Sequence, residues 1–376
     1  SYEENGVQRD AEGDILGLQY GLSDAETQNY FTKFGYDFDQ EKRLQFSYNY
    51  FSSQQKTDLG DVPGDINEGV KTYAIHVPEA LQKRGKPQGP DGNENITLKY
   101  TDSNIFANSE MTLDVYSQDI ENVFFFSPNL ANPDEGYDGG QSIIRSEKRG
   151  ARATFNTAID FDGVEATFIY GIDALKDTTS QPLVDGRVWV PEMEMDSLAG
   201  FLQTKWVIHD DVIVKAGVRR ESIDLSVDDY ETLKLCRSET QCSVPLQVKG
   251  DTIDYDATTY NIAFKYNWSD SFSPFFNYSQ GSDIADIGRL LRAATVDDIG
   301  LIQTEASIID NYEVGFTSLF DQVRLEVAAY RSTSELGTTN SFNEVTGVYE
   351  PVRAPQEIWG YEGLVDYRIS ETLNVV

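Results

Sequence analysis

Apolar and polar residues alternate strictly along most of this chain. Between 30 and 36, for example, Tyr30, Thr32 and Phe34 share one side of an extended chain, and Lys33 and Gly35 lie on the other. The same period recurs at 44–50, 96–100, 111–115, 151–159, 164–170, 198–206, 212–218, 260–268, 312–316, 323–327 and 359–369. A period of two places side chains on opposite faces of a β-strand, so each segment predicts a strand with one apolar face. We expect an all-β fold with no helical stretch.

The connections between these segments are of two kinds. Some are tight turns, as at 39–42, 161–163 and 209–211. Others are long and rich in Gly, Asp, Asn and Pro: 52–93, 120–149, 174–196, 222–256, 281–308 and 332–357. Compact domains rarely alternate short and long connections, whereas outer-membrane barrels do so regularly. The spacing predicts about fourteen strands, about seven turns and about six long loops.

The two faces of the predicted strands differ in character. One is aliphatic and aromatic, with Tyr36, Tyr50 and Trp206 toward strand ends, and the other is polar. Lipid outside and water inside would produce this pattern. A soluble β-sandwich would produce a similar alternation, and it remains an alternative. Together with the loops, the pattern favours a transmembrane antiparallel β-barrel.

The charge and the residue composition of the chain exclude some classes of partner and site. It carries 63 Asp and Glu against 30 Lys and Arg, a net charge of −33. Phosphate recognition needs clustered Lys and Arg, so we expect no nucleic-acid partner. Only two His and two Cys are present, which makes a His-based triad or a zinc site improbable. We expect no metal site.

Three stretches carry a family resemblance. The first is Tyr-Ser-Gln-Gly at 278–281, followed by Asp-Ile-Gly-Arg-Leu-Leu-Arg at 286–292. The second is Asp-Asn-Tyr-Glu at 310–313, and the third is Val-Arg-Ala-Pro at 352–355, leading into Trp-Gly-Tyr at 359–361. Their order and spacing resemble the barrel of TonB-dependent outer-membrane receptors, especially the ferric hydroxamate and aerobactin-type siderophore receptors.

The resemblance implies a receptor that imports a ferric siderophore, its transported ligand rather than a cofactor. Energy would come from the TonB–ExbB–ExbD complex, acting through an N-terminal plug in a barrel of about 22 strands. No bond is made or broken, so the resemblance implies a transporter and not an enzyme, with no catalytic residue. No plug is recognisable here, and 1–26 has the character of a loop end. We expect 1–376 to be a partial barrel domain in the bacterial outer membrane, lacking the plug and the first and last strands.

Four residues are candidates for ligand contact: Tyr278, Arg289, Arg292 and Arg353. An anionic ferric chelate needs local cations and aromatic surface, and positive charge is scarce in this chain. The alternative for the two arginines near 290 is ion pairing with loop acids such as Asp283.

Cys236 and Cys242 lie in the long 222–256 loop. In a surface loop of an envelope protein, two cysteines this close most simply form a local disulfide, with a redox or metal role as the alternative. His76 and His209 are expected to be ordinary polar loop residues.

Two other functions remain open at the level of sequence. One is a passive porin, a diffusion channel without a plug. The other is a secreted, soluble β-rich adhesion or binding protein without a lipid belt.

Overall fold

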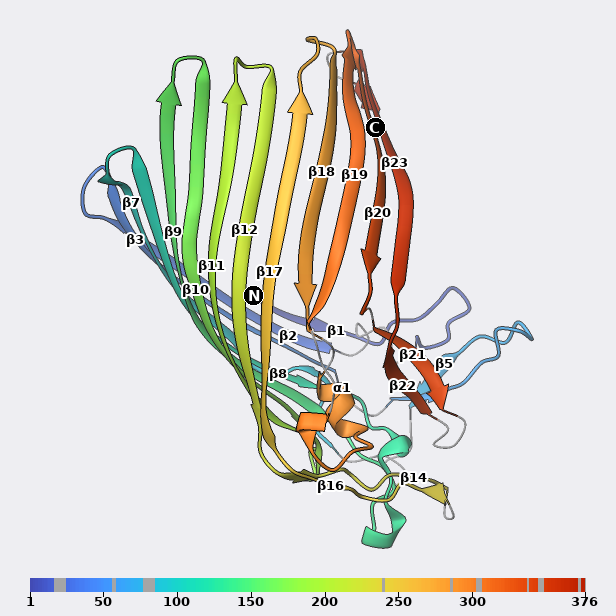
Figure 1. The fold of residues 1–376 in the computed structure, drawn as a ribbon. Coiled ribbons are helices and arrows are strands. Elements are labelled where there is room, and N and C mark those ends of the chain that lie inside the picture. Colours follow the sequence, from blue (N-terminus) through green and yellow to red (C-terminus); the bar gives the residue numbers. More distant parts are fainter. Residues whose placement is uncertain are drawn as a thin grey trace.

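The computed structural model describes residues 1–16, 25–55, 59–76, 85–238, 241–284, 287–301, 306–336, 338–343, 348–370 and 373–375. Antiparallel strands dominate, and one large sheet contains most of them (Figure 1). Its strands are β1 (Tyr2–Asn5), β2 (Ala25–Asp37), β3 (Lys42–Gln55), β6 (Gly89–Pro90), β7 (Asn93–Phe106), β8 (Ser109–Val123), β9 (Ile143–Phe161), β10 (Val164–Pro182), β11 (Val188–Ile208), β12 (Val212–Val227), β17 (Asp251–Tyr266), β18 (Phe272–Asp283), β19 (Ser307–Phe320), β20 (Val323–Ser334), β23 (Gln356–Ser370) and β24 (Leu373–Val375).

Neighbouring strands of this sheet follow one another in sequence. The order is β1-β2-β3-β7-β8-β9-β10-β11-β12-β17-β18-β19-β20-β23-β24, with β6 paired to β8. The predicted antiparallel meander is confirmed, with one strand more in this path than expected. Residues 1–26 are not simply a loop end, because β1 pairs with β2.

Short turns and long connections lie at opposite ends of the sheet. In Figure 1 the turns that join β9 to β10, β11 to β12, β17 to β18 and β19 to β20 lie at the top. Helix α1 (Ile287–Arg292) lies at the bottom with β14 (Cys236–Ser238) and β16 (Gln247–Val248). Asp210 and Asp321, in two of the turns, have φ of 63° and 51°. Asp tolerates this left-handed region better than most residues, which permits tight reversals.

One predicted loop is mostly strand. The 174–196 segment belongs to β10 and β11, and only 183–187 connects them. The apolar alternation stops near Ala174 and Leu198, but the ladder continues, with Lys176 opposite Asp196 and Thr178 opposite Glu194. Hydrophobic alternation identifies a strand only where one of its faces contacts an apolar medium. A prediction from alternation therefore does not detect strand residues that are polar on both faces.

The outer face of the sheet carries the apolar positions. Tyr170, Leu202, Val218 and Tyr260 lie opposite one another across β10, β11, β12 and β17. Leu202 and Tyr260 remain 42% and 53% exposed. Large apolar side chains this open are unusual on a surface in water, and they are expected on a surface in lipid.

The inner face is polar over most of its height. The row on this side is shifted by one residue along each strand from the outer row. It consists of Gln203, Gly217, Asn261 and Ser279. At the end with the long connections, the same face becomes apolar and packs helix α1. This helix corrects the expectation that no helical stretch exists.

Small hairpins and turns of 3-10 helix make up the rest of the described structure. The hairpins are β4 (Leu59–Val62) with β5 (Tyr73–His76), β13 (Tyr230–Glu231) with β16, β14 with β15 (Gln241–Cys242), and β21 (Thr338–Asn343) with β22 (Val348–Arg353). In the part of the chain that the structure describes, no helix is long and apolar enough to cross a membrane.

Candidate functional site

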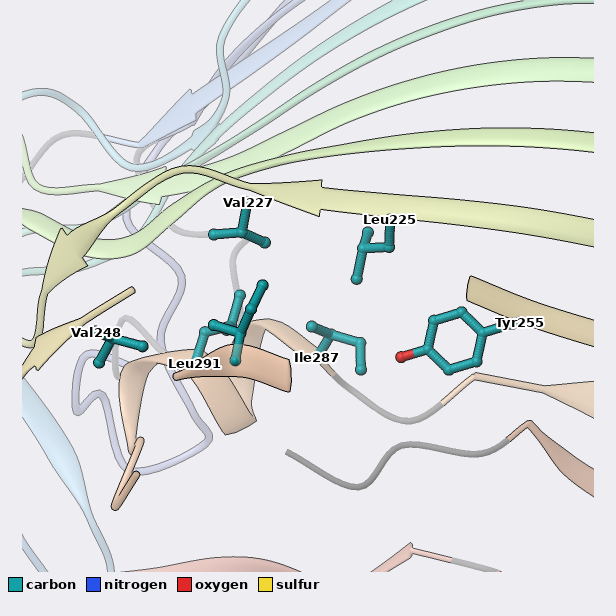
Figure 2. Packing of buried hydrophobic residues seen from close by; sticks show 7 residues of the cluster. Leu225, Val227, Val248, Tyr255, Ile287 and Leu291 are labelled. Atoms are coloured by element: carbon teal, nitrogen blue, oxygen red, sulfur yellow. The ribbon is translucent and has the colours of Figure 1, made fainter. Parts of the chain in front are cut away.

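Helix α1 is held against the inner face by a buried apolar cluster. Leu291 and Ile299 are fully buried there, with Leu225 and Val227 of β12 and Tyr255 of β17. Figure 2 shows Ile287 and Leu291 of the helix facing these strand residues. The connection between β18 and β19 therefore folds back onto the wall of the sheet.

Tyr230 fastens the same helix through a polar contact. Its hydroxyl donates a hydrogen bond of 2.8 Å to the carbonyl oxygen of Leu291. Burial raises the pKa of Tyr230 to about 12, so the phenol stays neutral and keeps its proton for this bond.

Arg289 and Arg292 both belong to helix α1 and are half-buried. The Arg292 guanidinium lies 4.5 Å from the ring centroid of Trp189, at the start of β11. Arginine over an indole face is a favourable cation–π pair. Sequence reasoning missed Trp189, because nothing in the pattern relates a residue of β11 to one a hundred positions later.

Tyr278 lies apart from these arginines, on the outer face. It is opposite Tyr312, with ring centroids 5.0 Å apart, and its hydroxyl donates to Asp310 at 2.7 Å. Gln280 donates to the same carboxylate at 3.0 Å. Two of the three stretches that carry the family resemblance, 278–281 and 310–313, therefore meet in one cross-strand contact, which gives both a structural role.

Arg353 ends strand β22, where its backbone is opposite Thr338. The hairpin β21–β22 approaches helix α1. The side chain of Arg353 lies outside the described residues.

Arg187 fixes the 124–142 connection and was not anticipated from the sequence. Its guanidinium donates to the carbonyl oxygens of Leu130 and Gly139, both at 2.8 Å, and to Asp185. It also lies 3.9 Å from the Tyr137 ring centroid. An arginine can hold two backbone carbonyls and a carboxylate at once because its donors point in fixed directions.

Cys236 and Cys242 are joined by a disulfide across the β14–β15 hairpin, with Cα atoms 3.9 Å apart. The amide of Cys236 donates to the carbonyl oxygen of Ala131 at 2.8 Å, and Lys234 pairs with Asp134. The hairpin is thereby tied to the 124–142 connection.

A ladder of ion pairs crosses the middle of the inner face. Asp173 of β10 pairs with Arg152 and, at 2.5 Å, with Arg219, which also pairs with Glu221 at 3.3 Å. Among the described residues, no group of three or more His, Cys, Asp or Glu is arranged to hold a metal ion. His76 ends β5, and His209 occupies the turn before β12.

Comparison with known proteins shows which family this chain belongs to. The model of the family described as "TonB dependent receptor-like, beta-barrel" matches residues 11–375. The chain belongs to the TonB-dependent receptors. Both the predicted family and the predicted transmembrane β-barrel class are confirmed.

Individual relatives of this TonB-dependent receptor chain are distant in sequence. It is 24% identical to the ferric aerobactin receptor of Klebsiella pneumoniae, over 99% of this chain and 55% of that protein. It is also 24% identical to the rhizobactin receptor of Rhizobium meliloti, over 91% of this chain and 49% of that protein. The chain thus spans about half the length of the curated relatives it matches.

Solved structures share the fold of this TonB-dependent receptor chain at lower identity. The copper transporter OprC aligns with a TM-score of 0.70 at 12% identity, over 98% of this chain and 54% of that one. The ferric yersiniabactin uptake receptor FyuA of Yersinia pestis aligns with a TM-score of 0.65 at 13% identity, over 99% and 53%. The matching family is described as receptor-like, and not as a porin or an adhesin.

Proposed function

We propose that this chain forms barrel wall in an outer-membrane receptor that takes up a ferric siderophore with energy from TonB. The family match over residues 11–375 carries the proposal. The names of the relatives, ferric aerobactin receptor and rhizobactin receptor, support iron chelates as the class of ligand. Transport involves no bond making, so the protein is proposed to be a transporter and not an enzyme, with the chelate as cargo.

Residues 1–376 are proposed to be a partial barrel domain. A plug and a TonB-contacting segment would belong to the rest of a longer receptor, and TonB–ExbB–ExbD would act through them. A closed sheet satisfies its backbone hydrogen bonds in lipid, and its inner face would enclose the path of the ligand.

Ligand capture is assigned to the end of the sheet with the long connections. Arg289 and Arg292 lie there on helix α1, beside Trp189, and Arg353 ends the hairpin that approaches this helix. These cations would hold an anionic chelate against the repulsion of a chain with net charge −33. Tyr278 is better assigned to the membrane-facing surface, because its partners are on the outer face.

Uptake by whole cells tests the function. Cells that lack their own aerobactin receptor would express the full-length receptor, and radioactive iron supplied as ferric aerobactin would be followed with and without TonB. TonB-dependent accumulation supports the proposal. Accumulation that does not need TonB, or no binding of this or any related carboxylate-hydroxamate iron chelate, would contradict it.

Substitution of Arg289 and Arg292 by Gln tests the capture site. Loss of two charge-assisted contacts should weaken ferric aerobactin binding by about tenfold or more. Arg149→Gln is the control, because Arg149 is an exposed arginine of β9 at 71% side-chain exposure and pairs only with Glu147 among the described residues. Unchanged affinity in the double variant would remove the arginines from the site and leave the transport function standing.

A further inference from the structure

Three lysines gather on the inner face in the half of the sheet nearest the short turns. Lys205 of β11 lies directly opposite Lys215 of β12. Lys265 of β17 is opposite Ile213, two positions from Lys215, so it is the diagonal neighbour of that lysine. Each of the three is adjacent in sequence to an outer-face residue of one row, Trp206, Val214 or Phe264, which places the lysines on the inner side.

Two other lysines on this face have acidic partners, whereas Lys33 of β2 is in no ion pair among the residues that the structure describes. Lys99 pairs with Asp114 at 3.6 Å and Lys148 with Asp177 at 3.3 Å. Within the described residues, no ion pair involves Lys205, Lys215 or Lys265. The nearest acid by register is Glu165, which is opposite Val207 and so diagonal to Lys205.

This arrangement carries an electrostatic cost. Like charges directly opposite each other on two strands destabilise a sheet. The neighbouring inner-face residues on the side of the long connections are Gln203, Gly217 and Asn261. They are uncharged and so do not offset the repulsion between the lysines. Three lysines therefore lie at one level of the inner wall, where the acids near them in register are Glu165 and Glu313, in a chain that is otherwise strongly acidic.

The lysines are also far from the proposed capture site. Lys215 and Leu225, which packs helix α1, are on the same strand. At about 3.3 Å per residue, the ten-residue interval between them is about 33 Å along the strand. A ligand held at the arginines cannot touch the lysines at the same time.

We propose that Lys205, Lys215 and Lys265 form an anion-binding site on the inner wall, which holds a carboxylate-bearing ferric chelate after it has left the loop end. The proposal rests on the function proposed above and extends it with a second site along the path of the ligand. Three ammonium groups can each donate to carboxylate oxygens while remaining able to release them one at a time. An anion here would offset the repulsion between Lys205 and Lys215.

The test compares the triple variant Lys205→Gln, Lys215→Gln, Lys265→Gln with the full-length wild-type receptor, using ferric aerobactin as the probe. Binding to energy-depleted cells, which reports the loop end, should be unchanged. TonB-dependent uptake should fall about tenfold. The triple Lys→Arg variant should retain uptake, and a Lys99→Gln, Lys148→Gln double variant controls for loss of inner-face charge as such.

Thermal unfolding of the purified receptor without ligand separates this site from a permanent contact. If the three lysines have no acidic partner in the ligand-free receptor, the Gln triple variant should melt at the same temperature as wild type or slightly higher. The reason is that the substitution removes the repulsion between Lys205 and Lys215. A clearly lower melting temperature would show that acidic groups elsewhere in the receptor already pair with them, and would overturn the proposal. Unchanged uptake would overturn it too. A wild-type receptor that binds neither ferric aerobactin nor any related carboxylate-hydroxamate iron chelate would instead contradict the proposed function.

Discussion

Single residues on the loop side decide how helix α1 is held. Tyr230 reaches it through one hydrogen bond, and Arg292 reaches back from it to Trp189. Neither contact has a signature in the sequence, since each joins a connection to a distant element. The cations at 289 and 292 could be proposed as candidates once the family resemblance implied an anionic ferric chelate, because they follow the Tyr278 strand in a chain with little positive charge.

Tyr230→Phe should loosen helix α1 without unfolding the sheet. The Leu291 carbonyl loses its donor, a change of about 1 kcal/mol. Limited proteolysis should then cut the connection between β18 and β19 faster. Equal cleavage rates in both proteins would show that the apolar cluster alone holds the helix.

The same bond predicts a pH dependence. The pKa of Tyr230 is raised from 10.0 to about 12, so the folded state favours the neutral phenol. Its stabilising contribution is complete below pH 10 and is lost as the pH rises through about 12. Between pH 10 and about 12, the rate of proteolytic cleavage between β18 and β19 should rise more steeply in wild type than in Tyr230→Phe. The variant has no phenol to ionise.

At the scale of elements, sequence pattern located strands well and their ends poorly. The apolar stretches of β9 to β12 and β17 were predicted, because alternation is strict where one face meets an apolar medium. The outward extensions of β10 and β11 were missed, since residues such as Lys176 and Glu194 are polar like those of a loop. Helix α1 was missed because six residues are too few to display a helical period.

The β14–β15 hairpin offers a test at this scale. Reduction of the Cys236–Cys242 disulfide should loosen the hairpin and its contact with Ala131, with little effect on the sheet. A disulfide that closes so short a loop contributes a few kcal/mol at most. Hydrogen exchange should rise in 228–250 and stay low in β9 to β12. Global melting on reduction would contradict this view.

For the whole molecule, the orientation of the two faces is the central inference. Leu202→Lys places a charge in the apolar outer row, where lysine near the middle of a bilayer costs about 2–4 kcal/mol. Gln203→Lys places the same side chain one residue away on the polar inner face, where repulsion from Lys205 and Lys215 should cost about 1 kcal/mol or less. Urea unfolding of the receptor in lipid vesicles measures the difference. Equal effects would reject the lipid-facing assignment.

The length of the strands has a consequence for how a cell presents this protein. Strand β11 has 21 residues, so at about 3.3 Å each it is about 70 Å long. Tilted by about 45°, it rises about 49 Å, against a hydrocarbon layer of about 30 Å. In the proposed orientation, ordered wall bearing Lys176, Glu194 and Asp196 stands clear of the lipid. An antibody or a bacteriophage would therefore meet a rigid, charged strand surface between the lipid and the loops. Its epitope would be set by the geometry of the sheet.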